Sequence, residues 1–258
     1  ELSERLNYLS GQAYSLKNLG LVYYYQGDFV NTINYWQQSI GIFEKIGDKV
    51  GVANLLSNIG SVYNIQGDDT KALELYLQSL KASEESGDSL RIATALMNIG
   101  LVYSKKPKSE DKALEYYLRA LPISEALNDY EAIGTTWFNI GEIYYKQFND
   151  SLALDYFEKS LEVLAYTGNI FYSLNYIGRV YAREGQFEKA IQYQKESYDK
   201  AKNVDAKPDM ARALLALADT YIMQKNYSLA LKALNEAKSI AKDIGSFYEL
   251  KDSYEKLA

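Results

Sequence analysis

The 258-residue sequence predicts an all-α fold built from repeated pairs of helices. Three observations predict it. A phrase recurs along the chain as NIGSVY at 58–63, NIGLVY at 98–103 and NIGEIY at 139–144. Apolar residues around each copy recur at intervals of three and four, as they do on the buried face of a helix. Turn residues separate the copies at a nearly constant spacing, which is the signature of a repeat architecture.

Six copies of the phrase divide the chain into repeats. A small residue marks each copy at steps of 37 to 41 residues: Gly20, Gly60, Gly100, Gly141, Gly178 and Ala218. A tyrosine follows three residues after each and is interpreted as a core residue. We predict a single array of repeats at about 8–47, 48–87, 88–128, 129–168, 169–205 and 206–245, with partial helices at 1–6 and 246–258. Because the pattern continues at both ends, we expect a fragment of a larger protein.

Each repeat is predicted to hold two helices, A and B. In the second repeat, LLSNIGSVY and KALELYLQSL each carry one apolar face, and Gln66-Gly67-Asp68 separates them. Glycine suits the left-handed position after a helix, and aspartate can cap the next one. Helix A of the fifth repeat is about three residues shorter than the others. Similar pairs stand where each helix B should end: Gly47-Asp48, Gly87-Asp88, Asn128-Asp129, Gly168-Asn169 and Gly245-Ser246.

The glycine in the middle of helix A needs a packing reason, because it costs about 1 kcal/mol relative to alanine. Two helices in contact leave little room for a side chain where they cross. We expect the glycine to face the small residue of helix B, as Gly60 would face Ala72, with larger residues around them. Trp36 and Trp137 are interpreted as packing residues.

The composition argues against several classes of function. The chain has neither cysteine nor histidine, which excludes disulfides, thiol nucleophiles and Cys/His zinc sites. We predict no catalytic residue, no metal and no cofactor. The net charge of −6 disfavours nucleic acid, and there is no apolar run of about 18 residues that would insert in a membrane.

The pattern resembles the tetratricopeptide repeat, which carries Gly or Ala near the middle of helix A, Tyr three residues later, and Ala in helix B. The standard unit has about 34 residues, and the longer units here resemble those of kinesin light chains, G-protein-signalling modulators and bacterial peptide-pheromone receptors. They also resemble the sensory portions of bacterial histidine kinases and nucleotide cyclases. The resemblance implies a right-handed superhelical solenoid of antiparallel helix pairs, in which helix A lines a concave groove.

In such a solenoid, the positions six and three before the small residue, one after it, and four or five after it share one stripe of helix A. We call these positions the inner stripe. It holds six basic and two acidic residues, and it is rich in aromatic residues, which are common at binding hot spots. We expect it to bind an extended peptide that has acidic character or ends in a free carboxylate; the alternative is an ordinary solvated helix face. The candidate residues are Lys17, Tyr24, Lys105, Phe138, Tyr145, Lys146, Tyr172, Arg179, Arg183 and Arg212.

Asparagines form a second candidate set, two residues before the glycine. An amide offers both a donor and an acceptor, as a peptide main chain requires. In pheromone receptors and kinesin light chains, asparagines in this region of helix A hold the ligand main chain, so the resemblance implies the same role here. The alternative is hydrogen bonding between neighbouring helices. The set is Asn18, Asn58, Asn98 and Asn139, with Asn175 one position away in the fifth repeat.

The predicted function is therefore a non-enzymatic scaffold that binds a protein or peptide segment, as the sensory or regulatory part of a larger signalling protein of bacterial type. The alternative is a structural spacer or dimerisation module without a ligand, with a homodimer formed through the ends of the chain or through flanking domains. The cytoplasm is the favoured compartment, and the periplasm is the alternative for a membrane-anchored sensor.

Overall fold

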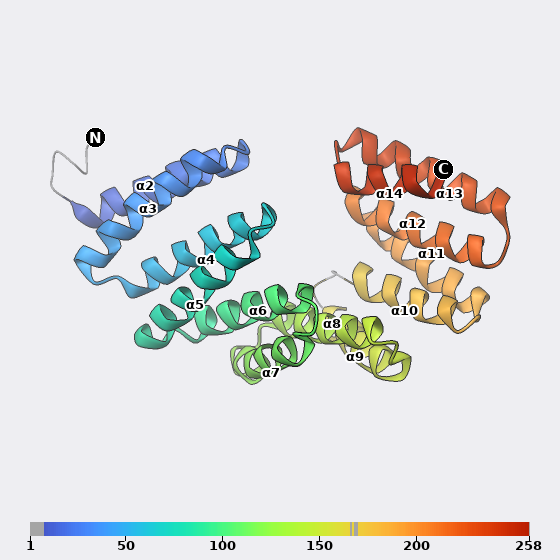
Figure 1. Ribbon diagram of the computed structural model, residues 1–258, viewed down its shortest axis with the longest axis horizontal. Coiled ribbons are helices and arrows are strands. Elements are labelled where there is room, and N and C mark those ends of the chain that lie inside the picture. The colour runs from blue at the N-terminus through green and yellow to red at the C-terminus, as the bar shows by residue number, and fades with distance from the viewer. Residues whose placement is uncertain (1–7, 166, 168–169, 258) are drawn as a thin grey trace. The chain divides into compact units, whose positions relative to one another are not determined.

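The chain is described by a computed structural model that covers residues 8–165, 167 and 170–257. These residues form thirteen α-helices and no strand, so the predicted all-α class is confirmed. They fall into two compact units, residues 1–129 and residues 130–258, called unit 1 and unit 2. Within each unit, successive helices lie side by side as antiparallel hairpins (Figure 1).

Unit 1 holds three helix pairs. The even-numbered helix of each pair is helix A and the odd-numbered one is helix B. The pairs lie within the first three predicted repeats, and the partial helix expected at 1–6 lies outside the described residues. The helices are α2 (Leu9–Tyr25), α3 (Phe29–Ile46), α4 (Lys49–Ile65), α5 (Asp69–Ser86), α6 (Ser89–Lys105) and α7 (Glu110–Leu127).

Unit 2 holds three further pairs and one more helix. Its fifth-repeat helix A has 13 residues, whereas α8 and α12 have 17 each, so the predicted shortening is present and amounts to about one turn. The helices are α8 (Tyr130–Lys146), α9 (Asp150–Leu164), α10 (Phe171–Arg183), α11 (Phe187–Asn203), α12 (Lys207–Met223), α13 (Tyr227–Asp243) and α14 (Phe247–Leu257).

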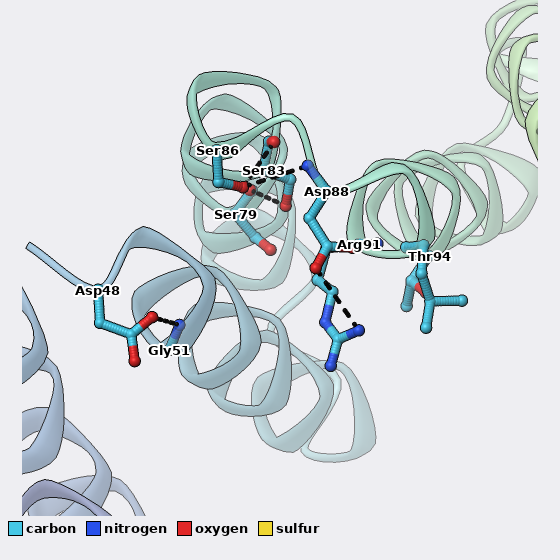
Figure 2. Close-up of polar contacts among 9 residues, drawn as sticks. Asp48, Gly51, Ser79, Ser83, Ser86, Asp88, Arg91 and Thr94 are labelled. Atoms are coloured by element: carbon cyan, nitrogen blue, oxygen red, sulfur yellow. Dashed lines mark hydrogen bonds and ion pairs between the residues drawn. The ribbon is translucent and has the colours of Figure 1, made fainter. Parts of the chain in front are cut away.

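The predicted stops between helices act as expected. Gly47 ends α3 with a φ of 75°, and the side chain of Asp48 accepts a hydrogen bond from the backbone N–H of Gly51 at 2.8 Å. Figure 2 shows this cap in the region of α4 to α6. Asp88 caps α6 in the same way through the N–H of Arg91. The stop at 168–169 lies outside the described residues.

The glycines of helix A face a large side chain of helix B, which corrects the expected glycine–alanine contact. A Cβ added to Gly60 would lie 2.8 Å from the ring of Tyr76, which is four residues after Ala72. The backbone of the alanine is also near: the carbonyl of Ala153 would lie 3.3 Å from a Cβ on Gly141. Each glycine therefore leaves a notch for the side chain one turn after the small residue of helix B, which is Thr32 in the first repeat and alanine in the others: Trp36, Tyr76, Tyr117, Phe157 and Gln194.

The tyrosine that follows the glycine by three residues is only half-buried in most repeats, so its interpretation as a core residue was too strong. It stacks on a ring of helix B instead. The ring centroids of Tyr103 and Tyr116 are 5.6 Å apart, and those of Tyr144 and Tyr156 are 5.4 Å apart. Trp137 joins the second of these stacks, which confirms it as a packing residue.

A buried serine in helix B adds a hydrogen bond that the sequence analysis missed. The Ser79 hydroxyl donates to the carbonyl of Ala53 at 2.8 Å, and the same bond recurs in three other repeats. The signal is a serine nineteen residues after the glycine, at positions 39, 79, 160 and 197. With the filled notches, these bonds fix helix A against helix B.

Candidate functional site

The inner stripe of unit 2 is built by three consecutive A helices. Helix α10 contacts both α8 and α12, so the inner positions of the three adjoin. The ring of Phe138 on α8 lies 5.7 Å from that of Tyr172 on α10, measured between centroids. Tyr172 in turn accepts a hydrogen bond from Arg212 on α12 at 2.6 Å. Three of the predicted site residues thus form one continuous surface.

An apolar pocket opens beside this surface. Its volume is about 400 Å³. Four of its side chains are apolar or aromatic, and two carboxylates and two small polar groups complete it. Asn139, one of the predicted asparagines, is among them. We call it the apolar pocket; it is lined by Glu131, Thr135, Phe138, Asn139, Leu164, Phe171, Tyr172 and Asp209.

A second pocket shares Phe138 and Tyr172 with the first, and its volume is about 340 Å³. Two cations and two carboxylates are among its lining residues, so we call it the charged pocket. Asn175 lies in its wall, 7% exposed, and accepts a hydrogen bond from Arg179 at 3.3 Å. The lining residues are Phe138, Glu142, Tyr172, Asn175, Tyr176, Arg179, Arg212, Leu215 and Asp252.

Most cations of the stripe in unit 2 are paired with carboxylates. Arg212 contacts Asp209 at 2.9 Å and Glu249 at 3.0 Å. The predicted excess of basic residues counted only the stripe, and these partners lie outside it. Two further stripe cations are also paired: Arg183 with Asp150, and Lys146 with Glu142, which is itself a stripe residue.

Arg179 differs from these cations because it makes no ion pair among the described residues. Its guanidinium lies 5.5 Å from the ring centroid of Tyr176, at a distance typical of a cation–π contact. Glu142 and Asp252 also line the charged pocket, but neither forms an ion pair with Arg179. The surface therefore offers one such arginine rather than a row of them.

The buried tyrosine of the charged pocket has a perturbed acidity. Burial raises the pKa of Tyr176 well above the ordinary value of 10.0, and Glu142, which accepts a hydrogen bond from the Tyr176 hydroxyl at 3.0 Å, raises it further. The folded chain therefore holds this proton more tightly than the unfolded chain does.

The raised pKa predicts a pH dependence of stability. The contribution of Tyr176 is fully present below the unfolded pKa of about 10 and is lost as the pH rises above it. We expect the free energy of unfolding of the wild type to fall more steeply above about pH 10 than that of Tyr176→Phe, which cannot titrate. Urea denaturation at a series of alkaline pH values measures both slopes. Equal slopes would show that Tyr176 is not held in its protonated form.

Unit 1 carries a smaller pocket, with a volume of about 220 Å³, which we call the polar pocket. Arg91 and Thr94 of α6, whose side chains Figure 2 shows, line it together with the asparagine Asn58. Next to it, the Asn98 amide donates to the Ser57 hydroxyl at 3.1 Å. Asn98 thus bonds between neighbouring A helices, as the alternative interpretation required. The lining is Asn54, Ser57, Asn58, Ser79, Leu90, Arg91 and Thr94.

The other predicted residues are engaged in local contacts. Lys105 donates to the side chain of Asn64 at 2.9 Å, and Lys17 lies 5.8 Å from the ring centroid of Tyr14. Tyr24 packs on Trp36, with 6.0 Å between centroids, so it belongs to the packing of its repeat. Asn18 is exposed on α2, and Tyr145 packs between Tyr176 and Arg183.

Sequence reasoning missed several residues of these pockets. Asp209 stands three residues before Arg212, a helical spacing that would have revealed it. Glu249 lines neither pocket but pairs with Arg212, and it had no such signal because it comes from α14. Leu164 at the end of α9 and Phe171 at the start of α10 lie outside the inner stripe, so the stripe positions did not identify them.

The described residues hold no group of three or more acidic side chains placed to bind a metal ion. Among the helices that the structure describes, none has the length and apolar character needed to cross a bilayer.

Comparison with known proteins identifies the repeat. A family model described as tetratricopeptide repeat matches residues 10–85, 51–126, 91–165 and 169–243. The sequence matches no curated protein. Among solved structures, the apo form of RapI is 24% identical, with a TM-score of 0.69, and the match covers 90% of this chain and 85% of that chain.

Two further structures are similar in fold. The Rap conjugation gene regulator of plasmid pLS20, in complex with the Phr* peptide, is 18% identical with a TM-score of 0.67, over 95% of this chain and 71% of that chain. Aspartyl phosphate phosphatase F from Bacillus subtilis is 19% identical with a TM-score of 0.69, over 90% of this chain and 60% of that chain. These likenesses confirm the predicted helical-repeat fold.

Proposed function

The chain belongs to the tetratricopeptide-repeat family, and we propose that the inner stripe of its A helices binds an extended peptide segment of a partner protein without catalysis. The observation that carries the proposal is the surface of unit 2, where Phe138 and Tyr172 separate two open pockets. An extended peptide places side chains at intervals along its length, which suits pockets that adjoin. A Rap regulator that shares the fold was solved with a peptide, so this fold can hold a ligand of that class.

The charges of this surface restrict the class of peptide that can bind. Arg183 and Arg212 are satisfied by carboxylates of the chain itself, so a strongly acidic peptide would have to displace them. Arg179 is the cation left to pair with a ligand. We therefore propose a peptide with one carboxylate, from a side chain or a free C-terminus, at the charged pocket. Asn58 and Asn139, which line pockets in both units, would hold its main chain.

The remaining parts of the proposal concern the whole protein. We propose that the six repeats form one array and that binding regulates an attached signalling module. One similar structure carries the name of a phosphatase, but it is 19% identical and shares the fold alone. The spacer or dimerisation role is the alternative, and it would be accepted if no peptide binds.

A peptide selection tests the proposal. Random twelve-residue peptides displayed on phage are selected on the wild-type chain, and binders are expected to contain a carboxylate. Arg179→Gln is expected to weaken these peptides by about tenfold or more, because it removes a charge-assisted hydrogen bond of about 1.5–3 kcal/mol. Isothermal titration calorimetry measures the affinities.

Lys195→Gln is the matched control, because it removes one positive charge from the exposed surface of the B helix α11. It should change the affinity less than twofold, roughly the scale of a remote surface charge. Enrichment of basic peptides, or equal losses in both variants, would refute the role of Arg179.

A further inference from the structure

The apolar pocket and the polar pocket occupy the same place in their repeats. Each is lined by the residues six, three and two positions before a glycine of helix A. Residues of the following A helix and one residue of helix B also line each pocket. The three shared positions are Asn54, Ser57 and Asn58 before Gly60, and Thr135, Phe138 and Asn139 before Gly141.

The two pockets differ in the described residues that the following A helix contributes. In unit 1, Leu90 and Arg91 come from the first turn of α6 and close the polar pocket. In unit 2, the equivalent helix begins at Phe171, and it contributes Phe171 and Tyr172, the latter at the position of Thr94. The volume rises from about 220 to about 400 Å³, and the wall changes from polar to aromatic.

The wall chemistry indicates what fits. Three side chains of the wall offer no hydrogen bond to a ligand: Phe138, Leu164 and Phe171. The fourth, Tyr172, is 42% exposed and lies at the opening. An apolar cavity of about 150 Å³ suffices to bind benzene, so this pocket has room for a large side chain. The carboxylate of Asp209 at its edge is already paired with Arg212.

We propose that the apolar pocket of unit 2 is a selectivity pocket that takes one large apolar side chain, aromatic or leucine, of the bound peptide. This inference rests on the proposed function and specifies its ligand. The adjoining charged pocket places Arg179 on the other side of Phe138 and Tyr172. The recognised segment therefore combines a large apolar residue with a nearby carboxylate.

A small probe tests the pocket without a peptide. Binding of 5-fluoroindole to the wild-type chain is followed by fluorine NMR. Thr135→Trp fills the apolar pocket from its wall and is expected to weaken the probe at least tenfold. Asn54→Trp, at the equivalent position of the polar pocket, is the matched control and should leave the affinity within twofold.

A second variant tests the pocket if Thr135→Trp does not fold. If circular dichroism shows that Thr135→Trp is unfolded, Tyr172→Ser removes the exposed aromatic wall and should weaken the probe by a similar factor. Equal affinity in the folded pocket variant and the control, or no binding of the probe to the wild type, would overturn the inference.

Measurements of peptide binding distinguish a failure of this inference from a failure of the proposed function. Replacing the apolar residue of a selected peptide by alanine should weaken it at least tenfold on the wild type, and hardly at all on Thr135→Trp. Selected peptides without a large apolar residue would overturn the pocket's role while leaving peptide binding intact. Failure to select any peptide, while fluoroindole still binds, would count against the proposed function alone.

Discussion

Replacing Phe157 with alanine is expected to lower the free energy of unfolding by about 3–5 kcal/mol, as is typical for a buried aromatic residue. Phe157 is fully buried, and its ring fills the notch at Gly141, where an added Cβ would lie 2.7 Å away. The ring also supports the binding surface, because it lies 5.5 Å from the ring of Phe138 and 5.3 Å from that of Tyr176. Its loss leaves a cavity that this rigid hairpin cannot close.

Chemical denaturation monitored by circular dichroism measures the effect. Phe148→Ala is the control, since Phe148 is 78% exposed and follows α8 in a turn. It should change stability by about 0.5 kcal/mol or less, as surface substitutions usually do. A Phe157→Ala variant as stable as the control would mean that the glycine notch is not a site of tight packing.

Replacing Gly100 with leucine is expected to destabilise the chain by about 1–3 kcal/mol through overpacking. The first carbon of the new side chain would already lie 2.7 Å from the ring of Tyr117. That ring is fully buried and cannot move aside. Gly41→Ala is the control, because nothing lies within 4 Å of an added Cβ there. Alanine at this helical position should stabilise by up to about 1 kcal/mol.

The sixth repeat suggests how the same contact can be rescued. It pairs Ala218 with Leu234, both buried in one cluster, where other repeats pair glycine with a ring. The double variant Gly100→Ala, Tyr117→Leu copies this pair. It should be more stable than the sum of the two single changes predicts, by about 0.5–3 kcal/mol. Strict additivity would contradict a direct contact between the two positions.

The fold could be predicted from the sequence because its rules are local. The repeat period, the apolar spacing and the Gly-Asp stops each occur several times. Misinterpreting one copy therefore does not change the predicted fold. The contact at the glycine was predicted incorrectly, because sequence spacing shows that Ala72 and Tyr76 both face helix A but not which one fills the notch. That choice depends on side-chain direction and packing.

The site was less predictable, because it depends on neighbours that are distant in sequence. The arginines of the stripe were identified, but their partners Asp150 and Glu249 lie on other helices, 33 and 37 residues away, so the charge was overestimated. The apolar pocket was missed for a similar reason. Its wall combines Phe138 and Leu164 with Phe171 and Tyr172 at the start of α10, and sequence periodicity does not show the space that these side chains enclose.

The central claim is that a peptide binds the inner stripe of the A helices. A peptide selected on the wild-type chain and carrying a benzophenone group can be photo-cross-linked to it, and mass spectrometry then identifies the linked residues. We expect cross-links on the A helices α8, α10 and α12, close to Phe138, Tyr172 and Arg179. Cross-links confined to the B helices α9, α11 and α13 would contradict it.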